Sequence, residues 1–267
     1  MATAHLANGA PSYWMAASCD TIIQPQHHKP MNIHLILNFL QQLADNNSTA
    51  WMHEHKALYQ EARKEFEQGV ADTINTLTPI DPTIAHLAPK DCCFRLNRDI
   101  RFSQDKSPYK RHFGAYISAH GKKGLHGGYY IHVRPGHCLL ATGAYWLPTN
   151  ILTATRNEIM GNIDEWRQRV ESSDFVSTYG HANEGYWAED DDVSPQGFGI
   201  AHLKKAPRDF PADYEHIGYL KMKDYCCWKR VGDDFFDQAD WTGRACRLFG
   251  IAKPMMDFVN GAIDDYE

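Results

Sequence analysis

The chain has 267 residues, of which 43% are hydrophobic and 22% charged, a balance that is ordinary for a folded globular protein and excludes a disordered chain. Its formal net charge is -6, from 27 basic and 33 acidic residues, which excludes a generally basic nucleic-acid-binding surface. No apolar run approaches the ~20 residues of a membrane span, and the first lysine or arginine is Lys29, so we expect neither a membrane helix nor a secretory signal.

The seven cysteines favour a reducing compartment. Cys92 and Cys93 are adjacent, as are Cys226 and Cys227, and no C-x-x-C spacing occurs. Neighbouring cysteines bridge poorly with each other, and an odd number cannot all pair. We therefore expect free thiols, most of them in the core, and a cytoplasmic location.

The first 30 residues mix Ala, Ser, Pro, Gly and His without periodicity, which predicts a loosely attached arm. Residues 31–267 are expected to form a single α+β domain. Apolar residues spaced three or four apart from Ile33 to Leu43 predict a helix. A second, longer helix is expected to begin at a cap on Ser48 or Thr49 and to end before Pro79.

The middle of the chain reads as strands at 92–102, 113–118, 128–134 and 138–146, separated by Gly or Pro turns. Helical periodicity returns from Asn150. A connection rich in Pro, Gly and Asp covers 180–213, a strand is expected at 217–231, and two C-terminal helices are expected around 234–249 and 254–264. The order predicts an α+β fold with a central, mostly antiparallel sheet packed with N-terminal and C-terminal helices.

The segment 95–118, "RLNRDIRFSQDKSPYKRHFGAYIS", carries much charge for a strand. In an extended strand its odd positions, Arg95, Asp99 and Arg101 among them, would share one face. Arg98 would point with the apolar set, where a guanidinium needs a carboxylate partner. The turn that follows would return Lys106 and Lys110 to the end of the strand.

A neighbouring strand at 128–134 would place Tyr130, His132 and Arg134 on one face. If it pairs near the first strand, His132 and Arg134 join Arg101 and Lys106 around one concavity. Arginine forks and lysine charge suit a phosphate or carboxylate, and histidine suits proton transfer. Two other interpretations stay open: arginine–aspartate pairs on a solvated sheet face, or a basic surface that docks a macromolecule.

Fifteen histidines raise the question of a metal, but no H-x-x-x-H helix pair with a carboxylate occurs, so no metal site is expected. The stretch "HGKKGLHGG" (120–128) lacks the spacing of a phosphate-binding P-loop. No G-x-S-x-G nucleophile elbow is present. The sequence names no cofactor.

The stretch "DCCFRLNRDIRFSQDKSPYKRHFGAYIS" (91–118) resembles the signature F-R-x-x-R-D-x-R-F-S-x-D-K-[ST]-P-Y-K of the family called domain of unknown function 2461. The stretches "GYYIHVRPG" (128–136) and "APRDFPADYEHIGYLKMKD" (206–224) are similar to its downstream blocks. The opening block at 39–59 departs from the family pattern at Met52 and His55. The resemblance implies one intracellular α+β domain, and it supplies no reaction, cofactor or catalytic residue.

The leading hypothesis is a cleft that binds a phosphorylated or carboxylated small molecule, with His132 as acid or base and Asp99 orienting an arginine. The ligand would be held by Arg95, Arg101, Ser103, Lys106, Tyr109, Lys110, Tyr130 and Arg134. Whether catalysis follows stays open. The alternative is a module without enzymatic activity that docks an acidic protein segment or nucleic acid through the basic segment 95–123.

Overall fold

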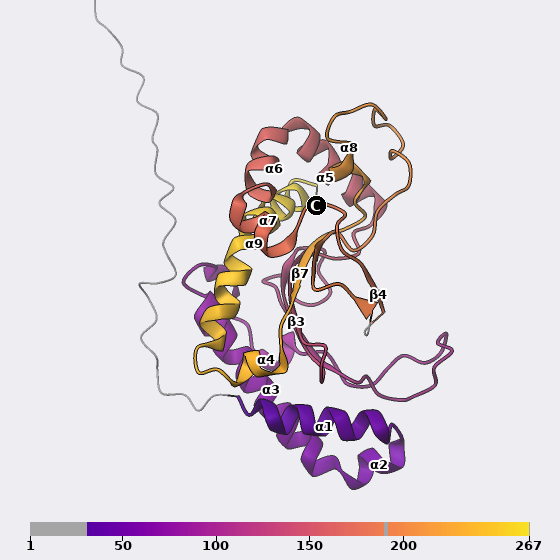
Figure 1. Ribbon diagram of the computed structural model, residues 1–267, viewed down its shortest axis with the longest axis vertical. Coiled ribbons are helices and arrows are strands. Elements are labelled where there is room, and N and C mark those ends of the chain that lie inside the picture. Colours follow the sequence, from indigo (N-terminus) through magenta and orange to yellow (C-terminus); the bar gives the residue numbers. More distant parts are fainter. Residues whose placement is uncertain (1–30, 190–191, 267) are drawn as a thin grey trace, which may run out of the picture.

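The structure, a computed structural model, describes residues 31–189 and 192–266 (Figure 1). The expected arm at residues 1–30 lies outside the described residues. The fold is α+β, with a five-stranded antiparallel sheet and helices from both ends of the chain, as predicted. None of the helices in the described part of the chain is long and apolar enough to cross a bilayer.

The N-terminal helices pack as an antiparallel pair below the sheet in Figure 1. Helix α1 (Ile33–Asp45) begins at Asn32, whose side chain accepts the Leu35 N–H, and it buries the apolar residues that predicted it. The expected second helix is divided at His55 into α2 (Thr49–Glu54) and α3 (Lys56–Leu77). At the end of α2 the backbone N–H and the ring Nδ1 of His55 both contact the Trp51 carbonyl.

The sheet has the strand order β1-β2-β3-β7-β6, and every neighbouring pair is antiparallel. Its strands are β1 (Phe113–Ile117), β2 (Gly128–Val133), β3 (Leu139–Ala144), β7 (Tyr225–Arg230) and β6 (Gln196–Phe198). A separate two-stranded ribbon is formed by β4 (Trp187–Glu189) and β5 (Asp192–Val193). Strands β1, β2 and β3 lie where the sequence predicted strands at 113–118, 128–134 and 138–146.

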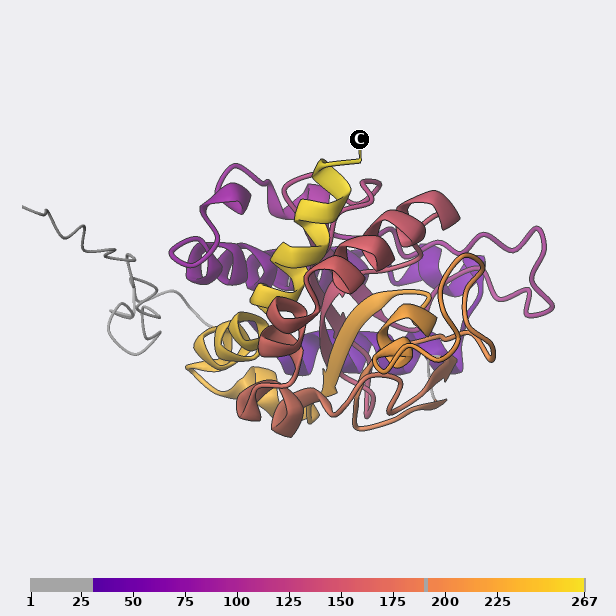
Figure 2. The ribbon, with the colours of Figure 1, turned by 90° about the horizontal axis from the view of Figure 1, so that it is seen from above.

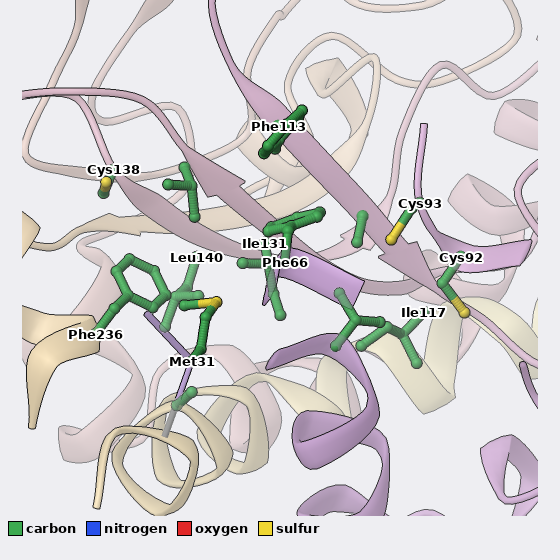
Figure 3. Close-up of a cluster of buried hydrophobic side chains, with 14 of the residues drawn as sticks. Met31, Phe66, Cys92, Cys93, Phe113, Ile117, Ile131, Cys138, Leu140 and Phe236 are labelled. Carbon is green, nitrogen blue, oxygen red and sulfur yellow. The ribbon is translucent and has the colours of Figure 1, made fainter. Parts of the chain in front are cut away.

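One face of the sheet is covered by helices. Side chains such as Phe113, Ile131 and Leu140 meet Phe66 of α3 in the first core cluster, drawn in Figure 3. A second cluster packs the other end of the sheet against the C-terminal helix and three shorter ones. These helices are α5 (Thr149–Gly161), α6 (Ile163–Val170), α7 (Ser173–Tyr179) and α9 (Trp241–Asp264). Figure 2 shows α9 running past both groups of helices, so it joins the two clusters.

The opposite face of the sheet is only partly covered. Its small cluster consists of Leu139, Ala141, Val193 and Trp228, with Tyr130, Trp187 and Ile200 packed against it. The strand alternation explains the division, because in β2 Tyr129, Ile131 and Val133 point into the helix-covered core while Tyr130 and His132 point the other way. The uncovered remainder of this face forms the cleft described below.

The predicted strand at 92–102 is wrong. Helix α4 (Pro89–Cys92) occupies its beginning, and afterwards only isolated bridges form, Cys93 to Ala115 and Asn97 to Tyr109. The Asp99 carboxylate accepts the backbone N–H of Arg101, a side-chain bond that competes with strand pairing. In Figures 1 and 2 the segment between α4 and β1 reaches away from the body of the protein as a long loop.

Three further predictions differ from the structure. The expected strand at 217–231 is the short helix α8 (Ile217–Lys221) followed by β7, and the connection at 180–213 contains β4, β5 and β6. The two C-terminal helices are one continuous helix, α9, with Pro254 inside it and a 3-10 turn (Asp233–Asp237) before it. Buried side chains on both sides of Pro254 hold α9 in place, and this packing outweighs the ~3 kcal/mol cost of an internal proline.

Candidate functional site

The protruding segment 98–107, here called the charged loop, is closed by its own side chains. Two backbone bonds join its base, from Arg98 N–H to the Pro108 carbonyl and from Lys110 N–H to the Leu96 carbonyl. The Arg98 guanidinium donates to the Asp105 carboxylate, to Ser107 Oγ at 2.6 Å and to Ser103 Oγ at 3.2 Å. Asp105 is therefore the carboxylate partner that the sequence required for Arg98.

The carboxylate of Asp105 is strongly stabilised in its charged form. Its oxygens accept the backbone N–H and the hydroxyl of Ser107, and then the Arg98 guanidinium. These bonds lower the pKa of Asp105 to about 2, with the Ser107 backbone N–H as the largest cause. The network fixes the inner part of the charged loop.

The outer part of the charged loop points into solvent. Arg101 is bound to Asp99 through two nitrogens at 2.9 and 2.6 Å, and its side chain is 75% exposed. The hydrogen bond from Arg101 lowers the pKa of Asp99. Lys106 Nζ donates to the Ile100 carbonyl at 3.0 Å, and Phe102 is 96% exposed. These cations are thus paired within the loop rather than directed toward the sheet.

A cleft of about 480 Å³ lies on the partly covered face of the sheet. Its floor is formed by small residues of the central strands, Gly128, Ala141 and Gly143, together with Cys226. Its walls are aromatic and basic. They consist of Phe94, Lys110, His112, Tyr116, Lys122, His126, Tyr130, Tyr145 and Trp187, with Leu125 and Ile200.

Glycines in the strands make room for the cleft. Gly143 has φ +125°, and a Cβ there would lie 2.0 Å from the Tyr225 carbonyl oxygen, so no other residue fits. Two tyrosines lie across glycines of the neighbouring strand. A Cβ on Gly114 would meet the Tyr130 hydroxyl at 2.8 Å, and one on Gly128 would meet the Ile117 carbonyl oxygen at 2.6 Å before the Tyr116 ring at 3.0 Å.

Two lysines give the cleft a positive wall. The ammonium groups of Lys110 and Lys122 lie 5.3 and 5.8 Å from the centroid of the same ring, that of Phe94. Lys122 also donates to the Cys93 carbonyl at 2.7 Å. No Asp or Glu is among the described residues that line the cleft. The neighbouring Asp224 is buried and accepts the backbone N–H groups of Ile200, Ala201 and Cys226.

A tyrosine and two histidines adjoin the cleft. The Tyr130 hydroxyl is hydrogen-bonded to Nδ1 of His132 at 3.0 Å, and the His132 ring lies 4.2 Å from that of His112. His132 is buried, whereas Tyr130 and His112 line the cleft. A proton on His132 can therefore reach the cleft through the Tyr130 hydroxyl.

The thiol on the cleft floor is a poor nucleophile. Burial raises the pKa of Cys226 well above its usual value, and the neighbouring carboxylate of Asp224 adds to the effect. The thiolate is the reactive form, so Cys226 contributes volume rather than chemistry. Three side chains of metal-binding type, His120, His126 and Asp264, lie together beside the cleft.

The structure divides the predicted site residues. Lys110 and Tyr130 line the cleft, and His132 lies directly behind Tyr130. Asp99, Arg101, Ser103 and Lys106 belong to the charged loop instead. The other three belong neither to the cleft lining nor to the charged loop. Arg95 is exposed, and Arg134 follows the end of β2. The backbone of Tyr109 is hydrogen-bonded to the Asn47 side chain.

The residues are divided because the prediction assumed that side chains alternate between two faces along 92–102, and this segment is not a strand. Sequence reasoning also missed Lys122, His112, Tyr116 and Trp187 as cleft residues. Lys122 lies in the Gly-rich turn 120–128 and in the basic segment 95–123, but neither pattern places it beside Lys110. Trp187 carried no signal, because the ribbon that presents it was not predicted.

Comparison with known proteins agrees with the resemblance seen in the sequence. Residues 35–258, most of the chain, match the family model described as "Conserved hypothetical protein (DUF2461)". No curated protein and no solved structure matches the chain. The matched range contains the charged loop, all the strands and the residues that line the cleft. The chain therefore belongs to the DUF2461 family of conserved hypothetical proteins.

Proposed function

We propose that this protein binds a small phosphorylated or carboxylated molecule in the cleft, with Lys110 and Lys122 holding the anionic group. The observation that carries the proposal is the placement of two ammonium groups over one ring, that of Phe94, in a cleft whose described lining has no carboxylate. The attraction between an ammonium group and an anion is stronger in a cleft than on an open surface, because less water screens the two charges.

The remaining walls favour a ligand that also has a planar or apolar part. Tyr116, Tyr130, Tyr145 and Trp187 offer ring surface, and the small residues of the floor let a ring approach the backbone. A volume of about 480 Å³ lies within the usual range for small-molecule sites. An aromatic acid or a nucleotide-sized phosphate combines both features.

A proton-transfer step would use the pair Tyr130 and His132. Tyr130 would contact the bound molecule, and His132 would take the proton from its hydroxyl or return it. Asp99 has no part in this proposal, because it pairs with Arg101 in the charged loop. Binding alone and binding followed by acid–base catalysis are both compatible with this arrangement, and the Tyr130→Phe variant separates them by keeping the ring and removing the proton carrier.

A second candidate function is docking of an acidic protein segment by the charged loop. It is favoured by the exposure of Phe102 at 96% beside the Arg101 guanidinium, which lies 5.9 Å from the ring centroid. An exposed aromatic next to cations is a common anchor for a protein partner. Nucleic acid would meet the same residues and is the less favoured partner, because the protein as a whole is acidic.

We also propose that the protein works in the cytoplasm. None of the six described cysteines forms a disulfide with another described residue. Free buried thiols fit a reducing compartment.

The cleft is tested by differential scanning fluorimetry and calorimetry with nucleotides, sugar phosphates and aromatic acids. The variants are Lys110→Met and Lys122→Met, which remove the charge and keep most of the stem. The matched control is Arg101→Met, which removes a cation from the charged loop. A charge-assisted bond contributes about 1.5–3 kcal/mol, so each lysine variant should lose about 10- to 100-fold in affinity.

The control variant should bind the ligand as the unmodified protein does. Equal losses from Arg101→Met and the lysine variants would move the site to the charged loop. A ligand whose affinity none of the three substitutions changes would refute the cleft proposal. The melting temperatures of the variants without ligand show whether each is folded.

A further inference from the structure

His120, His126 and Asp264 form a cluster that the proposed function does not use. Nε2 of His126 lies 2.7 Å from Oδ1 of Asp264, and the His120 ring stacks on the His126 ring with centroids 3.5 Å apart. One ligand-type atom from each of the three residues lies within 4.8 Å of the others. His126 and Asp264 are 138 positions apart in the chain, so sequence spacing could not reveal the cluster.

The fold holds one member of the cluster rigidly. The backbone carbonyl of His126 accepts the Tyr116 hydroxyl at 3.0 Å, and the next residue, Gly127, donates its N–H to Asn260 Oδ1 at 2.6 Å. Asn260 lies one turn before Asp264 on α9, so the same helix positions both side chains. His126 is 3% exposed, and this burial limits its ring to one orientation.

The other two members are accessible. His120 is exposed in the turn between β1 and β2, and the Asp264 side chain is 62% exposed at the end of α9. His126 also lines the cleft, so the cluster lies at the border between the cleft and the outer surface. An ion from solution can therefore reach the three side chains without any opening of the core.

Two imidazoles and one carboxylate form the donor set of many zinc sites. Zn²⁺ and its neighbours in the first transition row accept nitrogen and oxygen ligands together, whereas Mg²⁺ and Ca²⁺ prefer oxygen alone. With bonds of about 2.0–2.1 Å, the ligand atoms of a tetrahedral ion lie ~3.3 Å apart. The separation of 2.7 Å between His126 and Asp264 is that of a hydrogen bond, ~0.6 Å shorter, so the exposed Asp264 carboxylate moves outward when an ion enters.

The His120 ring must move as well. Parallel stacked rings direct their nitrogen lone pairs along parallel lines, so His120 must rotate before it can share an ion with His126. His120 is exposed and is followed by Gly121, which has φ +74°, with a second glycine at Gly124. Nothing buried has to move with it.

The geometry points to a binding site for one divalent transition-metal ion, such as Zn²⁺, formed by His120, His126 and Asp264. The three residues supply three ligands, and a fourth position is left for water or for a bound anion. The site depends on its own ligands and is independent of whether the cleft holds an anion. In the absence of the ion, His126 and Asp264 form the hydrogen-bonded pair that the structure shows.

The test uses the full-length protein, freed of metal with a chelator and then titrated with Co²⁺ and Zn²⁺. Co²⁺ reports a low-coordinate site with nitrogen ligands through its visible absorption, and calorimetry gives the stoichiometry for Zn²⁺. We expect one tight ion per chain. His120→Ala and Asp264→Asn should each weaken binding at least about tenfold. Loss of a group that only supports a metal ligand already weakens binding by about that factor, so loss of a ligand itself should cost no less.

The matched control is His34→Ala. His34 and Asp237 form another surface histidine–carboxylate pair, with Nε2 and Oδ1 3.4 Å apart, but belong to no three-residue cluster among the described residues. This variant should keep the tight ion and its spectrum. The chain has 15 histidines, so weak binding that all the proteins share is background.

Two outcomes would overturn the proposal. One is a titration in which the unmodified protein binds Zn²⁺ no more tightly than this shared background. The other is a tight ion that persists in both His120→Ala and Asp264→Asn with an unchanged Co²⁺ spectrum. A rise in the melting temperature with Zn²⁺ that occurs in the unmodified protein and in His34→Ala, but not in Asp264→Asn, would support it through a second measurement.

Discussion

The charged loop and the cleft both contain cations, and they differ in what those cations contact. In the loop, Arg98 and Arg101 donate to carboxylates only two to seven positions away in the sequence. In the cleft, Lys110 and Lys122 come from different segments and share one aromatic ring. Charge that is dense in the sequence is paired locally in the loop, whereas the two cleft lysines are brought together from separate segments by the fold.

The two regions also differ in their relation to the core. The cleft floor is part of the central strands, while the charged loop projects from the body and is held mainly by its own hydrogen bonds (Figure 1). A change in the floor should therefore affect the whole fold, and a change in the loop should remain local. Three experiments, from the largest expected effect to the smallest, test this difference.

The largest effect is expected for Gly143→Ala. The added Cβ would lie 2.0 Å from the Tyr225 carbonyl, at a φ of +125°, so both β3 and β7 would have to shift. Backbone strain and overpacking together predict a loss of about 3 kcal/mol or more in the free energy of unfolding, measured in urea.

The control for this experiment is Gly161→Ala, at the end of α5. A Cβ on Gly161 meets nothing within 4 Å, so the variant should be unchanged or stabilised by up to about 1 kcal/mol. Similar stabilities for the two variants would show that the cleft floor is not tied to the sheet as tightly as the distances require.

A smaller, local effect is expected for Arg98→Met. The substitution leaves Asp105 and two serine hydroxyls without their common donor, so the loop should open more often while the rest of the fold is unaffected. Limited proteolysis should cut first within 98–107, while the ligand affinity of the cleft remains the same. Arg101→Met should leave the free energy of unfolding and the protease sensitivity nearly unchanged, as is usual for an exposed ion pair. Equal protease sensitivity of the two variants would contradict the assignment of Arg98 as the organising residue of the loop.

The smallest effect is a pH dependence of the charged loop. Folding lowers the pKa of Asp105 from 3.8 to about 2, so its bonds stabilise the loop above pH 3.8 and are lost as the pH falls from 3.8 toward 2. The amide proton of Ser107, which donates to Asp105 at 2.8 Å, should shift upfield in NMR spectra with a midpoint near pH 2. In Asp105→Asn this titration should disappear, and a midpoint near the ordinary value in the unmodified protein would contradict the network.

The sequence was sufficient for the fold class and for strands β1, β2 and β3, which are short apolar or aromatic segments between Gly or Pro turns. In β2 the residues Tyr129, Ile131 and Val133 alternate onto the core face, whereas every residue of β3 is buried. The segment 92–102 has the same alternation, yet the Asp99 side chain and the Arg98 network give its backbone other partners. Strands β4, β5 and β6 have two or three residues each, too few for a period to be visible.

Only the part of the candidate site that lies on a regular strand could be predicted from the sequence. Tyr130 and His132 follow from alternation in a real strand, so their shared face was correct. Lys122 and Cys226 meet in the cleft only because β1, β2, β3 and β7 pair in a particular register, which places Gly143 opposite Cys226. Register between distant segments depends on the whole core and cannot be obtained from local patterns.

The two tyrosines that lie across glycines have a consequence for how ligand choice can change. An alanine in place of Gly114 would meet only the end of the Tyr130 side chain and could lift its ring, whereas an alanine in place of Gly128 would first meet the Ile117 carbonyl oxygen at 2.6 Å and strain the sheet. The volume of the cleft and its charge thus depend on different side chains. Under the proposed function, Gly114→Ala should therefore change the size of the molecule that the cleft accepts, and a substitution at Lys122 should change the charge that it accepts.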